Sequence, residues 1–304
     1  MSFLNLIRWK NLLIIVLVQL LIKYALLQPF GVHTSLDALW IYLLIIATIC
    51  IAAAGNIIND IYDVDIDTVN KPEKRIVGKS ISEQTAYNLF IGFNVIGVGI
   101  GFYVSHLVGK SAFFSLFVII SALLYVYASY LKGIILIGNI VISILVALSI
   151  LIVGIFELLP AITPDNQNIQ LSIFKKVFRY AVFAFMINLL RELVKDIEDI
   201  DGDYKAGMKT LPVVIGKERA TKVLFFLSII PLIIIAFYTI NTLYINQIAV
   251  AYFLICIIGP LIYITIKLFS AKTKKEYHHI SNILKLVMVL GMFSLLLYKY
   301  ILLK

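Results

Sequence analysis

Residues 36–67 read LDALWIYLLIIATICIAAAGNIINDIYDVDID, and the fold class follows from this stretch. Residues 36–58 are almost all apolar, and about 20 apolar residues in helical form cross the roughly 30 Å hydrocarbon core of a bilayer. A run of aspartates, Asp60, Asp63, Asp65 and Asp67, follows directly. The stretch therefore predicts a membrane-spanning helix that ends in an acidic motif.

The composition extends this prediction to the whole chain. Of 304 residues, 62% are hydrophobic and 14% are charged, whereas soluble chains are about half apolar and a quarter charged. Within lipid, every backbone polar group needs a partner inside the segment, and long apolar runs satisfy this as helices. We expect an all-α polytopic membrane protein with a single transmembrane domain over residues 1–304.

Nine apolar stretches are long enough to cross the membrane. They lie approximately at Asn11–Leu27, Leu36–Ile58, Thr85–Val104, Ala112–Leu131, Gly133–Leu158, Ile173–Leu190, Val223–Ile240, Ile248–Ile266 and Ile283–Leu297. Each predicts one transmembrane helix.

Basic residues orient these spans, because Lys and Arg gather in cytoplasmic loops. A cytoplasmic N-terminus puts most of them inside, and the group around Lys175 is the main exception. The chain carries a net charge of +9, but its basic residues follow alternate loops and do not form one patch. This pattern predicts contact with membrane lipids and no binding of nucleic acid.

The acidic residues are concentrated in two places. Of 17 Asp and Glu residues, six lie within residues 56–84 and seven within residues 188–222. Both regions fall at the predicted cytoplasmic ends of spans, the second and the sixth. They therefore lie on one side of the membrane and are expected to share a site.

Two motifs lie inside these regions, around residues 59–67 and 196–203. Each places aspartates at positions i, i+3 and i+7: Asp60, Asp63, Asp67 and Asp196, Asp199, Asp203. On a helix these positions share one face. Stripes of carboxylates at a membrane end repel each other unless cations lie between them, and oxygen ligands favour Mg²⁺. The repeat also suggests an internal duplication.

The aspartate motifs have three other interpretations. An EF-hand loop counted from Asp63 would place Thr68 and Lys74 where that loop has Gly and Glu, so it fails. A solvated acidic loop does not explain the apolar residues between the aspartates. A cation transporter stays open as a different class, although transporters place acids near the bilayer midplane.

The pattern Asn59-Asp60-x-x-Asp63-x-x-x-Asp67, with Asp196-x-x-Asp199-x-x-x-Asp203, resembles the two aspartate-rich motifs of the UbiA superfamily of intramembrane prenyltransferases. The resemblance implies transfer of a polyprenyl group from its diphosphate to an acceptor, with Mg²⁺ as cofactor. Together with the distribution of basic residues, this predicts an active site that faces the cytoplasm from the cell membrane.

Within that family, residues 191–203 followed by Gly207 and Thr210-Leu211-Pro212 are similar to the enzymes that prenylate geranylgeranylglyceryl phosphate. The expected acceptor is therefore the hydroxyl of a prenylglyceryl phosphate lipid, which would form an ether and release diphosphate. An aromatic acceptor, as in quinone or haem biosynthesis, is the alternative. Here Lys74-Arg75-Ile76 and Gly78-Lys79 depart from the family's usual pattern after the first motif.

These considerations assign roles to particular residues. The expected metal ligands are Asn59, Asp63, Asp67, Asp196, Asp199 and Asp203. The expected phosphate-binding cations are Arg8, Lys71, Lys74, Arg191 and Lys195. Lys132, which stands alone in a short loop, is expected to act in catalysis together with Asp60 or Glu198, either of which is a candidate for the proton acceptor. His278 and His279 are expected to be solvated.

Overall fold

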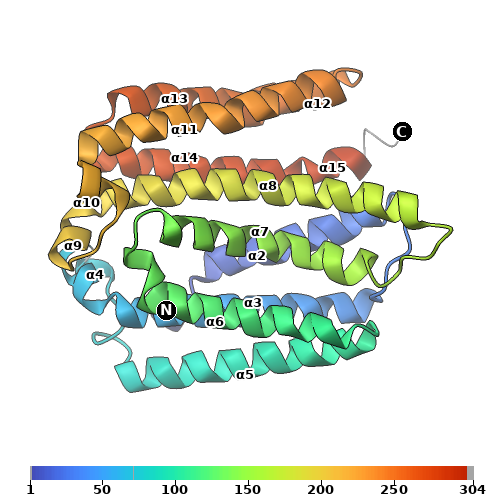
Figure 1. Ribbon diagram of the computed structural model, residues 1–304, viewed down its shortest axis with the longest axis horizontal. Coiled ribbons are helices and arrows are strands. Elements are labelled where there is room, and N and C mark those ends of the chain that lie inside the picture. Colours follow the sequence, from blue (N-terminus) through green and yellow to red (C-terminus); the bar gives the residue numbers. More distant parts are fainter. Residues whose placement is uncertain (1, 71, 300–304) are drawn as a thin grey trace. The chain divides into compact units, whose positions relative to one another are not determined.

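The computed structural model describes residues 2–70 and 72–299, and its regular elements there are all helices, apart from two isolated bridges (Figure 1). The chain forms two compact units. The first comprises Met1–Leu20, Val32–Lys132 and Leu148–Val177. The second comprises Leu21–Gly31, Gly133–Ala147 and Phe178–Lys304.

Eight helical segments of the described residues are long and apolar enough to cross a membrane. They are Trp9–Leu27, Ala38–Tyr62, Glu83–Leu107, Ser111–Ser129, Ile137–Leu158, Lys217–Leu243, Gln247–Ser270 and Lys274–Leu297. Each coincides with one of the nine spans predicted from the sequence.

The sixth predicted span, Ile173–Leu190, lies in helix α8 (Gln167–Glu198). This helix has the length to cross a bilayer, but it is not one of the eight apolar segments. Lys175, Lys176 and Arg179 charge the start of its apolar stretch. A total of nine spans therefore stays a prediction.

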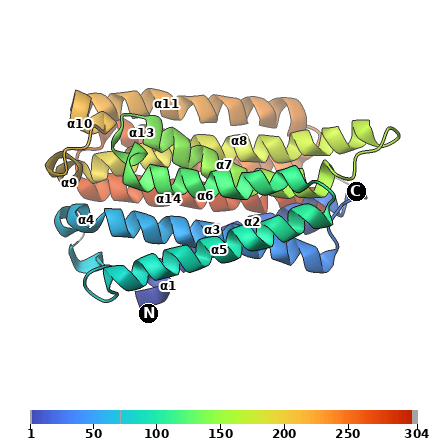
Figure 2. The same cartoon turned by 60° about the horizontal axis from the view of Figure 1, so that its bottom comes forward.

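The first unit is built around α3 (Ala38–Tyr62), α5 (Glu83–Leu107) and α6 (Phe114–Ser129), which lie side by side (Figures 1 and 2). The approach of α5 to α6 depends on Gly101, because a Cβ there would lie 2.4 Å from a ring carbon of Phe117. The unit also contains α1 (Ser2–Leu6), most of α2 (Trp9–Leu21) and α4 (Val64–Asn70).

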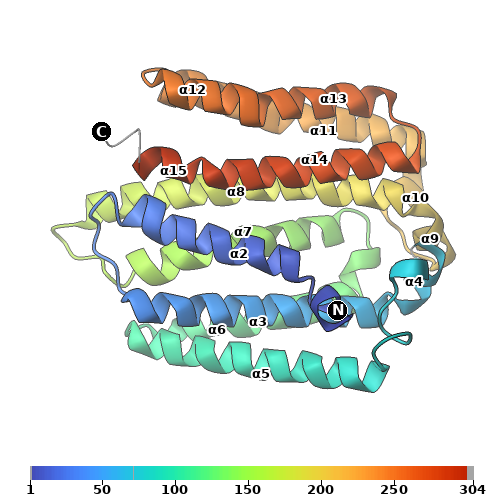
Figure 3. The same cartoon turned by 180° about the vertical axis from the view of Figure 1, so that it is seen from behind.

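The second unit packs α11 (Lys217–Tyr238), α13 (Gly259–Ser270) and α14 (Lys274–Phe293) against one another (Figure 3). Their buried residues, with Leu193 and Val194 of α8, form one apolar core. The shorter helices of this unit are α9 (Ile200–Lys205), α10 (Leu211–Ile215), α12 (Gln247–Phe253) and α15 (Leu295–Leu297). Helix α7 (Ile137–Leu158) contributes its first residues, up to Ala147.

An early part of the chain completes this second unit. Helix α2 continues as a π-helical segment, Ile22–Leu27, which packs against α15 near the C-terminus. The rings of Phe30 and Tyr298 lie 5.8 Å apart between centroids. Residues from both ends of the chain therefore belong to the same packed unit.

Candidate active site

The first aspartate motif spans a one-residue break between two helices. Helix α3 ends at Tyr62, Asp63 follows with φ −89° and ψ 2°, and α4 begins at Val64. The backbone N–H of Asp67 still donates to the carbonyl of Asp63 at 2.8 Å. The sequence predicts these aspartates on one face of a helix, and the structure places Asp63 in a one-residue interruption between two helices.

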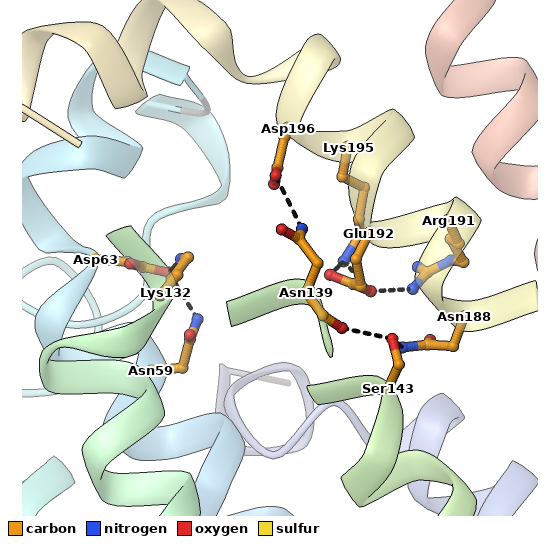
Figure 4. Close-up of polar contacts among 10 residues, drawn as sticks. All are labelled: Asn59, Asp63, Lys132, Asn139, Ser143, Asn188, Arg191, Glu192, Lys195 and Asp196. Carbon is orange, nitrogen blue, oxygen red and sulfur yellow. Dashed lines mark hydrogen bonds and ion pairs between the residues drawn. The ribbon is translucent and has the colours of Figure 1, made fainter. Parts of the chain in front are cut away.

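Asp63, in the first motif, contacts two other predicted site residues. It is buried, and its Oδ2 accepts a hydrogen bond from Nδ2 of Asn59 at 2.6 Å and pairs with the ammonium group of Lys132 (Figure 4). Lys132 lies in the short 3₁₀ turn after α6. The structure thus brings three of the predicted site residues together, although Lys132 is 69 positions away in sequence.

Asp60 has a different cationic partner. Nη2 of Arg8 lies 2.6 Å from its Oδ1, and the two side chains are 39% and 15% exposed. Arg8 itself has a φ of 52°, in the left-handed region that non-glycine residues rarely adopt. Asp67 lies within α4 beyond the break.

The second motif repeats the local geometry of the first. Helix α8 ends at Glu198, Asp199 follows with φ −103° and ψ 10°, and α9 begins at Ile200. The N–H of Asp203 donates to the carbonyl of Asp199 at 3.2 Å. The middle aspartate of each motif therefore occupies the same position, at a break between two helices.

A chain of polar side chains holds Asp196 (Figure 4). Nδ2 of Asn139 donates to Asp196 Oδ2 at 2.8 Å. One turn further along α7, Ser143 donates to the carbonyl of Asn139 at 2.6 Å and accepts from Asn188 at 3.2 Å. Asn139, Ser143 and Asn188 are buried and Asp196 is half-buried, so the hydrogen bond from Asn139 replaces part of the contact with water that Asp196 loses.

Asp196 lies beyond the predicted sixth span, at the end of α8. Burial raises the pKa of its carboxyl to about 8, and the hydrogen bond from Asn139 opposes that rise. Asp203 is also buried and accepts a hydrogen bond from the Thr210 hydroxyl at 3.3 Å. Thr210 had no predicted role of its own, and this contact places its hydroxyl on the second motif.

The two predicted phosphate-binding cations next to the second motif form ion pairs with Glu192. Arg191 Nη1 is 2.9 Å from Glu192 Oε1, and Lys195 Nζ is 3.1 Å from both carboxylate oxygens (Figure 4). Glu192 was missed as a site residue, although its place between two predicted cations was a signal for it. Lys71 and the side chain of Lys74 lie outside the described residues.

Glu198 contacts the start of the last long helix. Its Oε1 lies 3.0 Å from Nδ1 of His278 in α14, and the side chains are 9% and 55% exposed respectively. His278 is exposed, as the sequence predicts, and it also has a protein partner, which the sequence did not indicate. Nothing in the sequence indicated this contact, since 80 positions separate the two residues.

The donor set suits a hard divalent cation. Within each unit the motif offers carboxylate and amide oxygens, the ligands that Mg²⁺ prefers. Among the residues that the structure describes, no group of three His, Cys, Asp or Glu side chains lies close enough to hold a metal ion. The chemistry of the residues fits Mg²⁺, and the six predicted ligands stay a prediction.

Comparison with known proteins covers nearly the whole chain. Residues 12–289 match the UbiA prenyltransferase family. The digeranylgeranylglyceryl phosphate synthase of Methanosphaera stadtmanae is 30% identical over 258 residues, which cover 83% of this chain and 86% of that protein.

Two solved structures share the fold. One, concerned with digeranylgeranylglyceryl phosphate synthase in membranes, has a TM-score of 0.62 at 24% identity and covers 97% of this chain and 98% of its own. A UbiA homolog from Archaeoglobus fulgidus bound to DMAPP and Mg²⁺ has a TM-score of 0.56 at 20% identity, covering 97% of this chain and 99% of its own.

Proposed function

Because the chain belongs to the UbiA prenyltransferase family and is an integral membrane protein, we propose that it transfers a geranylgeranyl group from its diphosphate to a prenylglyceryl phosphate lipid. The acceptor is the free hydroxyl of that lipid, and the products are an ether and diphosphate. The single observation that carries this choice of substrate is the similarity to the Methanosphaera stadtmanae synthase over 83% of the chain.

Metal binding is assigned to the two motifs. Asn59, Asp63, Asp67, Asp196, Asp199 and Asp203 would hold Mg²⁺, with Asn59 and Lys132 keeping the Asp63 carboxylate in place. When bound, Mg²⁺ neutralises charge on the departing diphosphate, as a Lewis acid and a template. The hydrogen bond from Asn139 gives the Asp196 carboxylate a fixed orientation in the same way.

Cationic side chains supply the remaining positive charge. Preorganised charges that face the leaving group stabilise the transition state without reorganising during the reaction. We assign this role to Lys132 in the turn after α6, together with Arg8, Lys71, Lys74, Arg191 and Lys195. Arg191 and Lys195 share Glu192, which holds both side chains at the end of α8.

The reaction also needs an acceptor for the proton of the lipid hydroxyl. The oxygen of that hydroxyl forms a bond to C1 of the prenyl chain while the bond from C1 to the diphosphate oxygen breaks. A carboxylate takes the released proton. Asp60, paired with Arg8, and Glu198, paired with His278, are the candidates.

The proposed topology has nine spans, a cytoplasmic N-terminus and an active site that faces the cytoplasm from the cell membrane. The distribution of Lys and Arg over alternate loops supports it. Prenyl diphosphates are amphipathic. A site at the membrane surface can leave the charged diphosphate at the water-facing side while the prenyl chain stays in the apolar interior.

The test is product analysis with purified protein, Mg²⁺ and geranylgeranyl diphosphate. The acceptors are geranylgeranylglyceryl phosphate, its dephosphorylated alcohol, 4-hydroxybenzoate and 1,4-dihydroxy-2-naphthoate. Mass spectrometry is expected to find an ether of the glyceryl phosphate. Prenylation of an aromatic acceptor with no ether product would contradict the proposal and favour the quinone-type reaction.

A further inference from the structure

The first residues of the chain are docked on the C-terminal end of α3. Leu6 is fully buried in an apolar cluster with Ile57, Ile58 and Ile61 of that helix. The rings of Phe3 and Phe93 are stacked, with centroids 6.3 Å apart and planes inclined by 17°. The N-terminal segment Ser2–Arg8 is therefore anchored on the first unit, at the helix that carries the first aspartate motif.

A polar contact fixes the end of this segment. Nδ2 of Asn56 donates to the backbone carbonyl of Ile7 at 3.0 Å. Asn56 lies four residues before Asp60 on α3, so the two side chains share one face of the helix. The residue after Ile7 is Arg8, whose guanidinium lies 2.6 Å from Asp60.

The backbone of Arg8 has an unusual conformation, which the contacts on either side of it maintain. Its φ of 52° is unfavourable for a residue with a Cβ and persists only when the surroundings require it. Backbone hydrogen bonds join Arg8 N–H to Asn5 at 3.0 Å and Asn11 N–H to Arg8 at 2.8 Å. The anchored segment on one side and α2 on the other thus force the turn that points Arg8 at Asp60.

We propose that Leu6 and Asn56 are positioning residues for the reaction, because they hold the segment Ser2–Arg8 so that Arg8 pairs with Asp60. Leu6 supplies the apolar anchor, and Asn56 fixes the carbonyl next to Arg8. Their effect on substrate binding passes through Arg8 alone. This inference rests on the proposed function, in which Arg8 helps to bind the diphosphate and Asp60 is a candidate proton acceptor.

A double-mutant cycle between Asn56 and Arg8 tests this directly. Asn56→Ala is expected to weaken binding of a non-reactive geranylgeranyl thiolodiphosphate with Mg²⁺ by about fivefold, and Arg8→Ala by about tenfold. Because Asn56 acts through Arg8, adding Asn56→Ala to Arg8→Ala changes the dissociation constant by less than about twofold. Independent effects that multiply in the double variant would overturn the proposal.

Leu6 and Leu4 provide a matched pair in the same segment. Leu6 is fully buried and Leu4 is 47% exposed. Leu6→Ala is expected to weaken binding of the analogue and Leu4→Ala to leave it unchanged. Equal effects of the two substitutions would contradict the anchoring role of Leu6. Thermal unfolding in detergent identifies a Leu6→Ala protein that is generally destabilised, and the Asn56 cycle decides the question in that case.

Hydrogen–deuterium exchange of the ligand-free protein gives a readout that does not depend on activity. Asn56→Ala and Leu6→Ala are expected to speed exchange of the amides of residues 2–8 while α3 keeps its protection. Unchanged exchange in this segment would overturn the proposal. Failure of the proposed function would appear differently, as a wild-type protein that forms no prenyl ether.

Discussion

The ammonium group of Lys132 pairs with the carboxylate of Asp63, and the amide of Asn59 donates to the same oxygen. The Asp63 carboxylate, buried at the break between α3 and α4, therefore has one cationic and one amide partner. Removing one partner of a buried pair leaves an uncompensated charge, which is more costly than the loss of an exposed pair.

Lys132→Gln is accordingly expected to lower kcat/KM for geranylgeranyl diphosphate by about 100-fold, an effect of roughly 3 kcal/mol. Steady-state kinetics with the purified protein measures this. Lys110→Gln, at an exposed lysine of the same unit, serves as the control and is expected to be neutral. Equal activity of the two variants would argue against a role for Lys132.

The aspartates at the two helix breaks are expected to be indispensable. Asp63→Asn or Asp199→Asn removes a carboxylate that we propose as a metal ligand, so prenyl transfer should fall by at least about 1,000-fold. The nearby Asp65 and Asp201 are exposed, and Asp65→Asn and Asp201→Asn should retain activity within about threefold. Product formation measured by mass spectrometry compares the four variants. Near-normal transfer by both break variants would refute the metal assignment.

Removal of divalent metal should abolish transfer reversibly. With carboxylates as ligands and no metal between them, the diphosphate is repelled by the motifs. Treatment with EDTA is expected to stop ether formation, and added Mg²⁺ is expected to restore it. Transfer that continues in excess chelator, with metal content verified by elemental analysis, would contradict a divalent-metal mechanism.

The phosphate of the acceptor is expected to contribute to its recognition. The proposed site is surrounded by cations, and one charge-assisted contact is worth roughly 1.5 kcal/mol. Dephosphorylated acceptor should therefore react with a kcat/KM at least about tenfold lower. Competition between the two acceptors in one assay measures this ratio, and a ratio near one would show that the phosphate is not recognised.

The contact between His278 and Glu198 should have a small but specific effect. His278→Ala leaves a nearly buried carboxylate without its partner, whereas the neighbouring His279 contacts Tyr263 instead. A half-exposed pair contributes at most about 1 kcal/mol, so kcat/KM should fall by about threefold to fivefold. His279→Ala is the control, and equal losses in the two variants would indicate a general disturbance of α14.

The sequence predicted the helical membrane fold well because a helix that crosses the bilayer needs a long run of apolar residues, which is visible in the sequence itself. Eight of the predicted spans coincide with apolar helices, and the exception is α8, where Lys175, Lys176 and Arg179 interrupt the apolar pattern. The breaks at Asp63 and Asp199 could not be predicted, because the i, i+3, i+7 spacing fits an unbroken helix equally well.

Contacts between residues that are distant in sequence are the second feature that the sequence could not predict. Lys132 was chosen from its isolation in a short loop, and the structure places it on Asp63. His278 gave no such signal, because a histidine in a basic loop is usually solvated and its partner lies 80 positions away. Pairings of this kind depend on which helices become neighbours, and composition and spacing along one chain do not encode that.

The packing of Leu21–Gly31 within the second unit has a consequence for how the protein is made. These residues leave the ribosome long before α15, which they contact, and before Tyr298, which lies against Phe30. Domains generally fold as units during synthesis. The side chains of Ile22, Leu26 and Leu27, which are buried in the complete protein, therefore lack some of their packing partners until the last helix has been synthesised. The segment Ile22–Leu27 is therefore synthesised early, but it reaches its final packing only after α15 has been made.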